Sequence, residues 1–279
     1  EMKTELRGFQ LEKEQKYGEA IPFFRGYCET HPQNEEVWAR LGKLYYLMGQ
    51  PEEAKKAFGR ALGLYPDLNE ALYISALMNI DTKDFSAARK YVDEMLAVNA
   101  SAVDALYLKA LIFYKQKQYR QAIETLNRLL SLRIDFDWAH VLAGDIFRDT
   151  GKFAQAAKMY EQARRYRDNL ATVVQLADMR VRLKDYSQAE SLLEGALKVQ
   201  SSYYPIYKVM VRMFLQRNQL LEAGSVLKQL ENINNDAELW VLRALYFERT
   251  GNRQERQRML EQALKTDPGN AEALNMQKV

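Results

Sequence analysis

Residues 35–68 read EEVWARLGKLYYLMGQPEEAKKAFGRALGLYPDL and contain two short helical patterns in succession. In the first pattern Trp38 precedes Gly42 by four residues, and in the second Ala54 precedes Phe58 by four. Residues four apart lie on the same face of an α-helix, so each segment has a face that pairs a bulky side chain with a small one. We therefore expect two helices that pack against each other.

A glycine and a proline separate these two patterns. Gly49 suits the left-handed conformation that often ends a helix, and Pro51 suits the first turn of the next helix. Gly151 and Gly251 stand at equivalent places further along the chain. The first helix is therefore expected to stop here and the second to run back along it as a helical hairpin.

The same order of residues returns about every 34 positions. The alanine of the second helix occurs seven times in register, with Arg256 in the eighth slot: Ala20, Ala54, Ala88, Ala122, Ala156, Ala189 and Ala223. A bulky apolar residue follows each slot by four positions: Phe24, Phe58, Val92, Leu126, Tyr160, Leu193, Leu227 and Leu260. The first helices carry a column of small residues apart from one valine: Gly8, Gly42, Ala76, Ala110, Gly144, Ala177, Val211 and Ala244. Three positions after this column an aromatic residue is usual, but Asn79 and Arg180 replace it in two units.

This pattern resembles the tetratricopeptide repeat family, and residues 35–68 carry the family's signature in its usual order. The resemblance implies an all-α fold, a right-handed superhelical solenoid of antiparallel helix hairpins over residues 1–279. Its repeats are expected at about 1–34, 35–68, 69–102, 103–136, 137–169, 170–203, 204–236 and 237–270. Residues 271–279 are expected to cap the stack or to begin a further repeat.

Composition excludes several classes of protein. The chain has 279 residues, of which 47% are hydrophobic and 28% charged, as in a globular protein. Forty basic against thirty-seven acidic residues leave a net charge of only +3, which argues against a nucleic-acid binder. A single cysteine excludes internal disulfides and multi-cysteine metal sites. No apolar run reaches the roughly 18 residues that a membrane helix needs, so we expect no direct membrane insertion.

The compartment is not determined by these residues. The first segment is too charged for a signal peptide, and the chain begins at Glu1, as a processed product or a piece of a longer protein would. We expect a soluble segment, and the periplasm and the cytoplasm of a bacterium are both consistent with it.

No arrangement of residues points to catalysis. His31 and His140 are far apart, and neither has a second metal ligand at helical spacing. Cys28 has no histidine placed to activate it, and the chain lacks a phosphate-binding glycine loop. We therefore expect no catalytic residue, metal or cofactor.

The family resemblance implies that the first helices line a concave groove that binds a segment of a partner protein. One position past the Trp38 column lies a face that is apolar in the third to fifth repeats and mixed in charge beyond them. The candidate groove residues are Tyr73, Leu77, Ile80, Tyr107, Leu111, Tyr114, Trp138, Val141, Asp145, Arg148, Asp178, Lys208 and Arg212. A second interpretation is that tight curvature buries the apolar members against the adjacent first helix.

A subclass of the family grips a terminal carboxylate with lysines and asparagines, but those slots here hold Tyr73, Leu77, Tyr107 and Leu111. The resemblance therefore favours a non-enzymatic scaffold for a protein or peptide partner with bulky apolar side chains. By analogy with bacterial family members, its assembly would serve the envelope, secretion or polysaccharide export. Two alternatives stay open: a regulatory arm of a larger enzyme, and a helical-repeat RNA-binding protein.

Overall fold

The structure, a computed structural model, describes residues 2–231 and 235–278, and these form α-helices joined by short turns, with no strand. The all-α prediction is confirmed. The helix pairs are α1 (Met2–Lys13) and α2 (Tyr17–Thr30), α3 (Glu35–Leu47) and α4 (Pro51–Leu64), α5 (Asn69–Asp81) and α6 (Phe85–Val98), α7 (Val103–Lys115) and α8 (Tyr119–Leu132), α9 (Asp137–Asp149) and α10 (Phe153–Tyr166), α11 (Leu170–Arg182) and α12 (Tyr186–Val199), α13 (Tyr204–Gln216) and α14 (Leu220–Glu231), and α15 (Ala237–Thr250) and α16 (Arg253–Thr266). A last helix, α17 (Ala271–Gln277), follows them.

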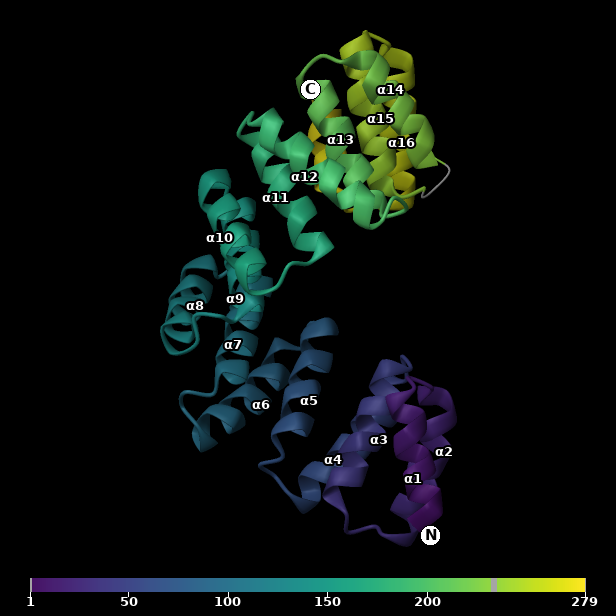
Figure 1. The fold of residues 1–279 in the computed structure, drawn as a ribbon, viewed down its shortest axis with the longest axis vertical. Coiled ribbons are helices and arrows are strands. Elements are labelled where there is room, and N and C mark those ends of the chain that lie inside the picture. Colours follow the sequence, from purple (N-terminus) through teal and green to yellow (C-terminus); the bar gives the residue numbers. More distant parts are fainter. Residues whose placement is uncertain (1, 232–234, 279) are drawn as a thin grey trace. The chain divides into compact units, whose positions relative to one another are not determined.

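The chain is divided into two compact units, residues 1–134 and residues 135–279. The first unit holds helices α1–α8 and the second holds α9–α17. Within each unit the hairpins stack in the order of the sequence (Figure 1). The single solenoid over residues 1–279 stays a prediction.

A left-handed residue ends the first helix of every hairpin. The glycines expected there have positive φ angles, 68° at Gly49, 74° at Gly151 and 77° at Gly251, which confirms their role as helix terminators. The other turns place a non-glycine residue in the same conformation: Gln15, Lys83, Lys117, Lys184 and Asn218. Turn geometry is therefore shared by all hairpins, although only three of them use the residue that adopts it at lowest cost.

The small-residue column is a packing device within each hairpin. A Cβ atom added to Gly42 would lie 2.9 Å from the ring of Phe58, and one added to Gly144 would lie 2.6 Å from the ring of Tyr160. Glycine therefore occurs where the second helix presents an aromatic ring. Where the first helix has alanine, the second helix presents a smaller aliphatic side chain, as in the buried pair Ala110 and Leu126.

Two departures from the repeat pattern are filled by arginines. Arg180, in an aromatic slot, forms ion pairs with Glu161 and Asp185. Arg256, in the alanine column, donates a hydrogen bond of 2.6 Å to the carbonyl oxygen of Met276 and so links α16 to α17. The long side chains replace apolar packing by polar contacts at these two positions.

The first helices of consecutive hairpins contact one another directly. In the first unit α3 contacts α5 and α5 contacts α7, and in the second unit α11 contacts α13 and α13 contacts α15. Within each unit, a second helix packs mainly on its own first helix and on the next helix of the same unit. The candidate groove residues lie on the first helices. Within one unit, the fold therefore places these residues on helices that are neighbours in space.

Candidate partner-binding surface

Helices α5 and α7 bring six candidate residues of the first unit onto adjacent elements. Tyr73, Leu77 and Leu111 are half-buried and pack on the hydrophobic cluster between α5, α6 and α7. Tyr107 and Tyr114 on α7 are also half-buried. These side chains therefore keep part of their apolar surface exposed on the first helices.

Ile80 differs from its neighbours because only 3% of its surface is exposed. It packs with Ala76 and Ile112 in the cluster that joins the third and fourth hairpins. Burial against the adjacent first helix, the second interpretation of this face, thus describes Ile80. Tyr73 shows both behaviours, since burial and then the charge of Asp104 raise the pKa of its hydroxyl while part of its ring stays exposed.

In the second unit the apolar candidates lie on α9. Trp138 is 49% exposed in the first turn of the helix, so its indole has a large area open to contact. Val141 is half-buried and packs on the cluster that contains Tyr160 and Leu176. Of these two residues, Trp138 is the one that presents a large apolar surface to solvent.

Asp145 and Arg148 face each other rather than solvent. The Oδ1 atom of Asp145 accepts hydrogen bonds of 2.8 Å from Arg148, 2.8 Å from the hydroxyl of Tyr160 and 3.2 Å from Gln175. Burial raises the pKa of Asp145, and the bonds from Arg148 and Tyr160 oppose this rise without cancelling it. Burial likewise raises the pKa of the Tyr160 hydroxyl. This group connects α9, α10 and α11.

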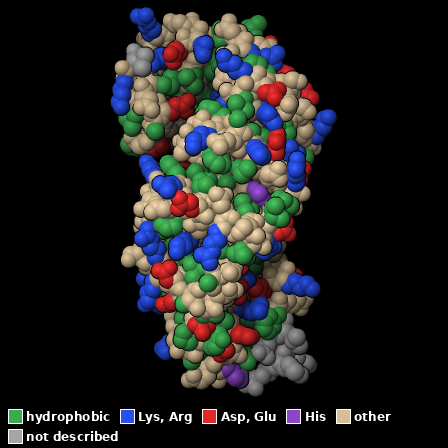
Figure 2. All heavy atoms as spheres, turned by 90° about the vertical axis from the view of Figure 1, so that its left-hand side faces the viewer, with side chains coloured by type: hydrophobic (Ala, Val, Ile, Leu, Met, Phe, Trp, Pro, Cys, Tyr) green, Lys and Arg blue, Asp and Glu red, His purple; other side chains and the backbone are tan. Residues whose placement is uncertain are grey.

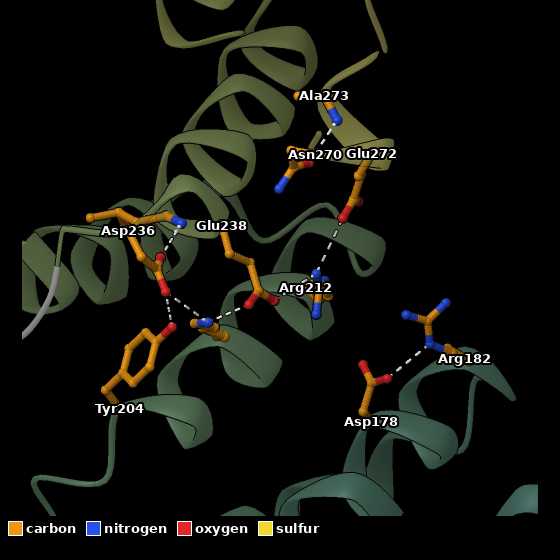
Figure 3. A network of polar contacts seen from close by, with 11 residues as sticks. Asp178, Arg182, Tyr204, Arg212, Asp236, Glu238, Asn270, Glu272 and Ala273 are labelled. Carbon is orange, nitrogen blue, oxygen red and sulfur yellow. Dashed lines mark hydrogen bonds and ion pairs between the residues drawn. The ribbon is translucent and has the colours of Figure 1, made fainter. Parts of the chain in front are cut away.

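Arg212 of α13 belongs to a second network (Figure 3). Lys208 lies one turn earlier on the same helix and shares Glu238 with it. Lys208 is 8% exposed and pairs with Asp236, at 3.2 Å, and with Glu238. Arg212 lies 2.9 Å from Glu238 and 3.4 Å from Glu272, which places it between α15 and α17.

The charges around Arg212 keep it protonated. Burial by itself lowers the pKa of Arg212, but the carboxylates of Glu238, Asp178 and Glu272 outweigh it and hold the pKa above its usual value. Asp178 is 9% exposed and accepts a hydrogen bond of 2.9 Å from Arg182.

These ion pairs change how the charged candidate groove residues are interpreted. The sequence predicts a groove of mixed charge, and the structure shows that each of these five charges has an opposite charge within the same unit. Figure 2 shows basic and acidic side chains interspersed with hydrophobic ones on the face that it displays. The sequence did not reveal the partners of Lys208 and Arg212 because they come from other elements, whereas Arg148 and Arg182 stand three and four positions after Asp145 and Asp178 in the same helices.

Two other reactive side chains, Cys28 and His140, are packed in the core, whereas His31 is exposed. Burial and then the charge of Glu29 raise the pKa of Cys28 to about 12, so the thiol stays protonated near neutral pH. His140 is buried and stacks on Tyr166 at 5.5 Å between ring centroids. Among the described residues no group of three or more histidine, cysteine or acidic side chains is placed to hold a metal ion. The same residues include no helix with the length and apolar character needed to cross a membrane.

A pocket beside Asn79 was not expected from the sequence. It has a volume of about 330 Å³ and lies between α3, α4, α5 and α6 of the first unit. The signal for it was the loss of the usual aromatic residue at Asn79, which the repeat register does reveal. None of the candidate groove residues lines this pocket.

Comparisons with protein families identify repeats over most of the chain. The model described as "Cytochrome c-type biogenesis protein H TPR domain" matches residues 23–137. Two models described as "Tetratricopeptide repeat" match residues 141–205 and 237–270.

Two curated proteins show the level of sequence similarity. The formate-dependent nitrite reductase complex subunit NrfG of Escherichia coli O157:H7 is 30% identical over 110 residues, which are 37% of this chain and 54% of NrfG. A DnaJ homolog subfamily C member 7 homolog of Schizosaccharomyces pombe is 29% identical over 156 residues, which are 50% of this chain and 33% of that protein. The chain thus spans about half or less of the length of these relatives.

Two solved structures share the fold. PilW, a type IV pilus biogenesis factor, is similar with a TM-score of 0.63 and 17% identity, over 75% of this chain and 98% of PilW. PilF of Pseudomonas aeruginosa is similar with a TM-score of 0.55 and 19% identity, over 88% of this chain and 96% of PilF. At this level of identity the likeness concerns the fold alone.

Proposed function

This chain is a member of the tetratricopeptide repeat family, and from that premise we propose that it is a non-enzymatic scaffold that binds a segment of another protein along its first helices. The observation that carries the proposal is an apolar strip on the adjacent helices α5 and α7, formed by Tyr73, Leu77, Tyr107, Leu111 and Tyr114. Tyr73 and Tyr107 occupy the same register position on these helices, as do Leu77 and Leu111, and all four are half-buried. A half-exposed aromatic surface of this kind is typical of protein interfaces.

The charge distribution supports an apolar partner segment. The charged candidates of the second unit pair with one another or with neighbouring helices, so they offer a partner few unpaired charges. The exposed part of the tyrosines and the indole of Trp138 offer apolar area and hydrogen-bonding groups instead. We therefore propose a partner segment with bulky apolar side chains, bound in the first unit mainly through contacts with the tyrosine rings of α5 and α7.

We also propose that the chain acts within a multiprotein assembly. Support comes from the relatives, since NrfG is named as the subunit of a complex and the matching family model takes its name from a biogenesis protein. A bacterial envelope, secretion or polysaccharide-export assembly is the narrower form of this proposal.

The test uses a library of random twelve-residue peptides selected on the purified chain. We expect the selected peptides to be rich in large apolar residues and to bind with a measurable Kd in fluorescence anisotropy. The double variant Tyr107→Ala and Tyr114→Ala should weaken the best peptide by at least about tenfold, the effect of losing about 1.4 kcal/mol of contact energy. Circular dichroism should show that the variant keeps its helical content.

The matched control removes one other tyrosine, Tyr65→Ala, which is exposed and lies outside the strip. It should bind the selected peptide as tightly as the unchanged chain. Equal binding by the double variant and the control would refute the position of the interface. Tight binding of single-stranded RNA with a steep dependence on salt would instead support the RNA-binding alternative.

A further inference from the structure

The pocket in the first unit arises where one repeat lacks its aromatic residue. The slot of Asn79 holds an aromatic ring in five other repeats: Tyr45, Phe113, Phe147, Phe214 and Phe247. Asn79 is shorter, and its amide nitrogen donates a hydrogen bond of 2.7 Å to the carbonyl oxygen of Ser75 in its own helix. The side chain is thereby held along α5 and lines the pocket of about 330 Å³.

The next boundary between hairpins shows what normally occupies this place. Phe113 stands 34 residues after Asn79, and Arg89 stands 34 residues after Lys55, which lines the pocket. The guanidinium carbon of Arg89 lies 5.7 Å from the centre of the Phe113 ring. An aromatic ring beneath a basic side chain therefore fills the corresponding position one repeat later.

The walls of the pocket suit an aromatic guest. Tyr46, Phe58 and Tyr91 contribute aromatic surface, and Met78 contributes a thioether, which makes favourable contacts with aromatic rings. Phe58 belongs to the buried core, so this wall is fixed in place. Lys55 is exposed and lies at the rim of the pocket. In the repeat register it corresponds to Arg89, which lies over the ring of Phe113.

We propose that this pocket binds a single aromatic side chain, tyrosine, tryptophan or phenylalanine, that a partner protein inserts between the second and third hairpins. The partner thus supplies the ring that the chain itself supplies at the next boundary. The site lies on α4, α6 and the C-terminal halves of α3 and α5, and it shares no lining residue with the proposed strip. It is a second, independent contact point on the scaffold.

The direct test follows the methyl group of Met78 by nuclear magnetic resonance. The chain is labelled with ¹³C in its methionine methyl groups, and the Met78 signal is identified with Met78→Leu. The probes are the neutral amides N-acetyl-tryptophanamide, N-acetyl-tyrosinamide and N-acetyl-phenylalaninamide, with N-acetyl-leucinamide for comparison. Ligands of this size are expected to bind with a Kd on the order of 1 mM, and the aliphatic probe at least about tenfold more weakly.

Two substitutions close the pocket in different ways. Asn79→Phe restores the aromatic ring of the other repeats, and it should raise the thermal midpoint while weakening the probes at least about tenfold. Gly59→Leu places a side chain at the pocket wall from α4, where an added Cβ meets no atom within 4 Å. Asn79→Ala keeps the pocket open and should bind the probes as the unchanged chain does.

Several results would overturn the proposal. One is the absence of a saturable Met78 shift up to about 20 mM probe, which is some twentyfold above the expected Kd. A second is equal affinity for the leucine and the aromatic probes, and a third is an unchanged titration in both pocket-closing variants. Tighter binding of free zwitterionic tryptophan than of its neutral amide would assign the pocket to a small molecule rather than a partner's side chain. None of these results depends on the strip of α5 and α7.

Discussion

The pairing of glycine with an aromatic ring makes a sharp prediction for Gly42→Ala. A Cβ atom at Gly42 would lie 2.9 Å from two carbons of the Phe58 ring and 3.0 Å from a third, and the ring is only 1% exposed. Overpacking of this kind costs about 1–3 kcal/mol, whereas alanine gains up to about 1 kcal/mol over glycine inside a helix. We expect a net loss of about 1 kcal/mol.

A second substitution, at position 58, removes the ring that the added Cβ atom would meet. Phe58→Leu replaces the ring by leucine, the residue that corresponds to Phe58 in the fourth repeat, where Ala110 takes the place of Gly42 and both Ala110 and Leu126 are buried. In this background Gly42→Ala no longer meets the ring, and the helix propensity of alanine should stabilise the hairpin by about 0.5–1 kcal/mol. The sign of one substitution therefore reverses, with a coupling energy of about 1.5–2 kcal/mol, within the range for residues in contact.

The measurement is hydrogen exchange of the amides in residues 35–68, supported by urea denaturation followed by circular dichroism. Exchange is preferred because repeat arrays open locally rather than in one step. Gly26→Ala is the matched control, since Gly26 lies within α2 and an added Cβ would meet no atom within 4 Å. The reasoning is refuted if Gly42→Ala changes protection by the same amount with phenylalanine and with leucine at position 58.

Three further predictions concern the turns, the thiol and a buried carboxylate. Lys117→Gly should raise the free energy of unfolding by about 0.5–1 kcal/mol, because Lys117 has a φ angle of 58° that glycine adopts without strain. An unchanged urea midpoint would contradict this prediction. The pKa of Cys28 is raised to about 12 by burial, so at pH 8 its reaction with a disulfide reagent should be slow until urea unfolds the first hairpin. Because this pKa is above the ordinary 9.0, the thiol's contribution to the free energy of unfolding is complete below pH 9 and is lost as the pH rises toward 12. Cys28→Ala should not show this loss of stability with pH. Asp145→Asn should leave the thermal midpoint at pH 7 unchanged or higher, because the amide oxygen still accepts a hydrogen bond from Tyr160 and burial disfavours the charge of the carboxylate. Asp145→Ala should lower the free energy of unfolding by about 1–3 kcal/mol, because it leaves the Tyr160 hydroxyl without this acceptor.

Repeat register made the helices predictable, because local spacing specifies them. Gly49, Gly151 and Gly251 have the positive φ expected of helix-ending residues. Lys83 and Lys117 adopt the same conformation without a sequence signal, since the packing of the two helices imposes it on whichever residue occupies the turn. The family could likewise be identified from columns of residues that recur in one chain.

The sequence placed Asp145, Lys208 and Arg212 on the first helices but could not show what they contact. Their partners include Tyr160, Glu238 and Glu272, and such pairs depend on how separate helices pack against one another rather than on spacing within one helix. For the same reason the sequence could not separate buried Ile80 from its half-exposed neighbours.

Asn79 is a position where the sequence and the tertiary structure each supply part of the explanation. Its departure from the aromatic slot is visible in the sequence, yet a departure can be filled, as Arg180 fills its slot with ion pairs to Glu161 and Asp185. Local spacing fixes helices because their hydrogen bonds join residues four apart, so the chain alone specified the hairpins and their columns. Cavities and ion pairs form between helices, where side-chain length and reach decide the outcome, and only the folded arrangement settled which gap was filled and which stayed open.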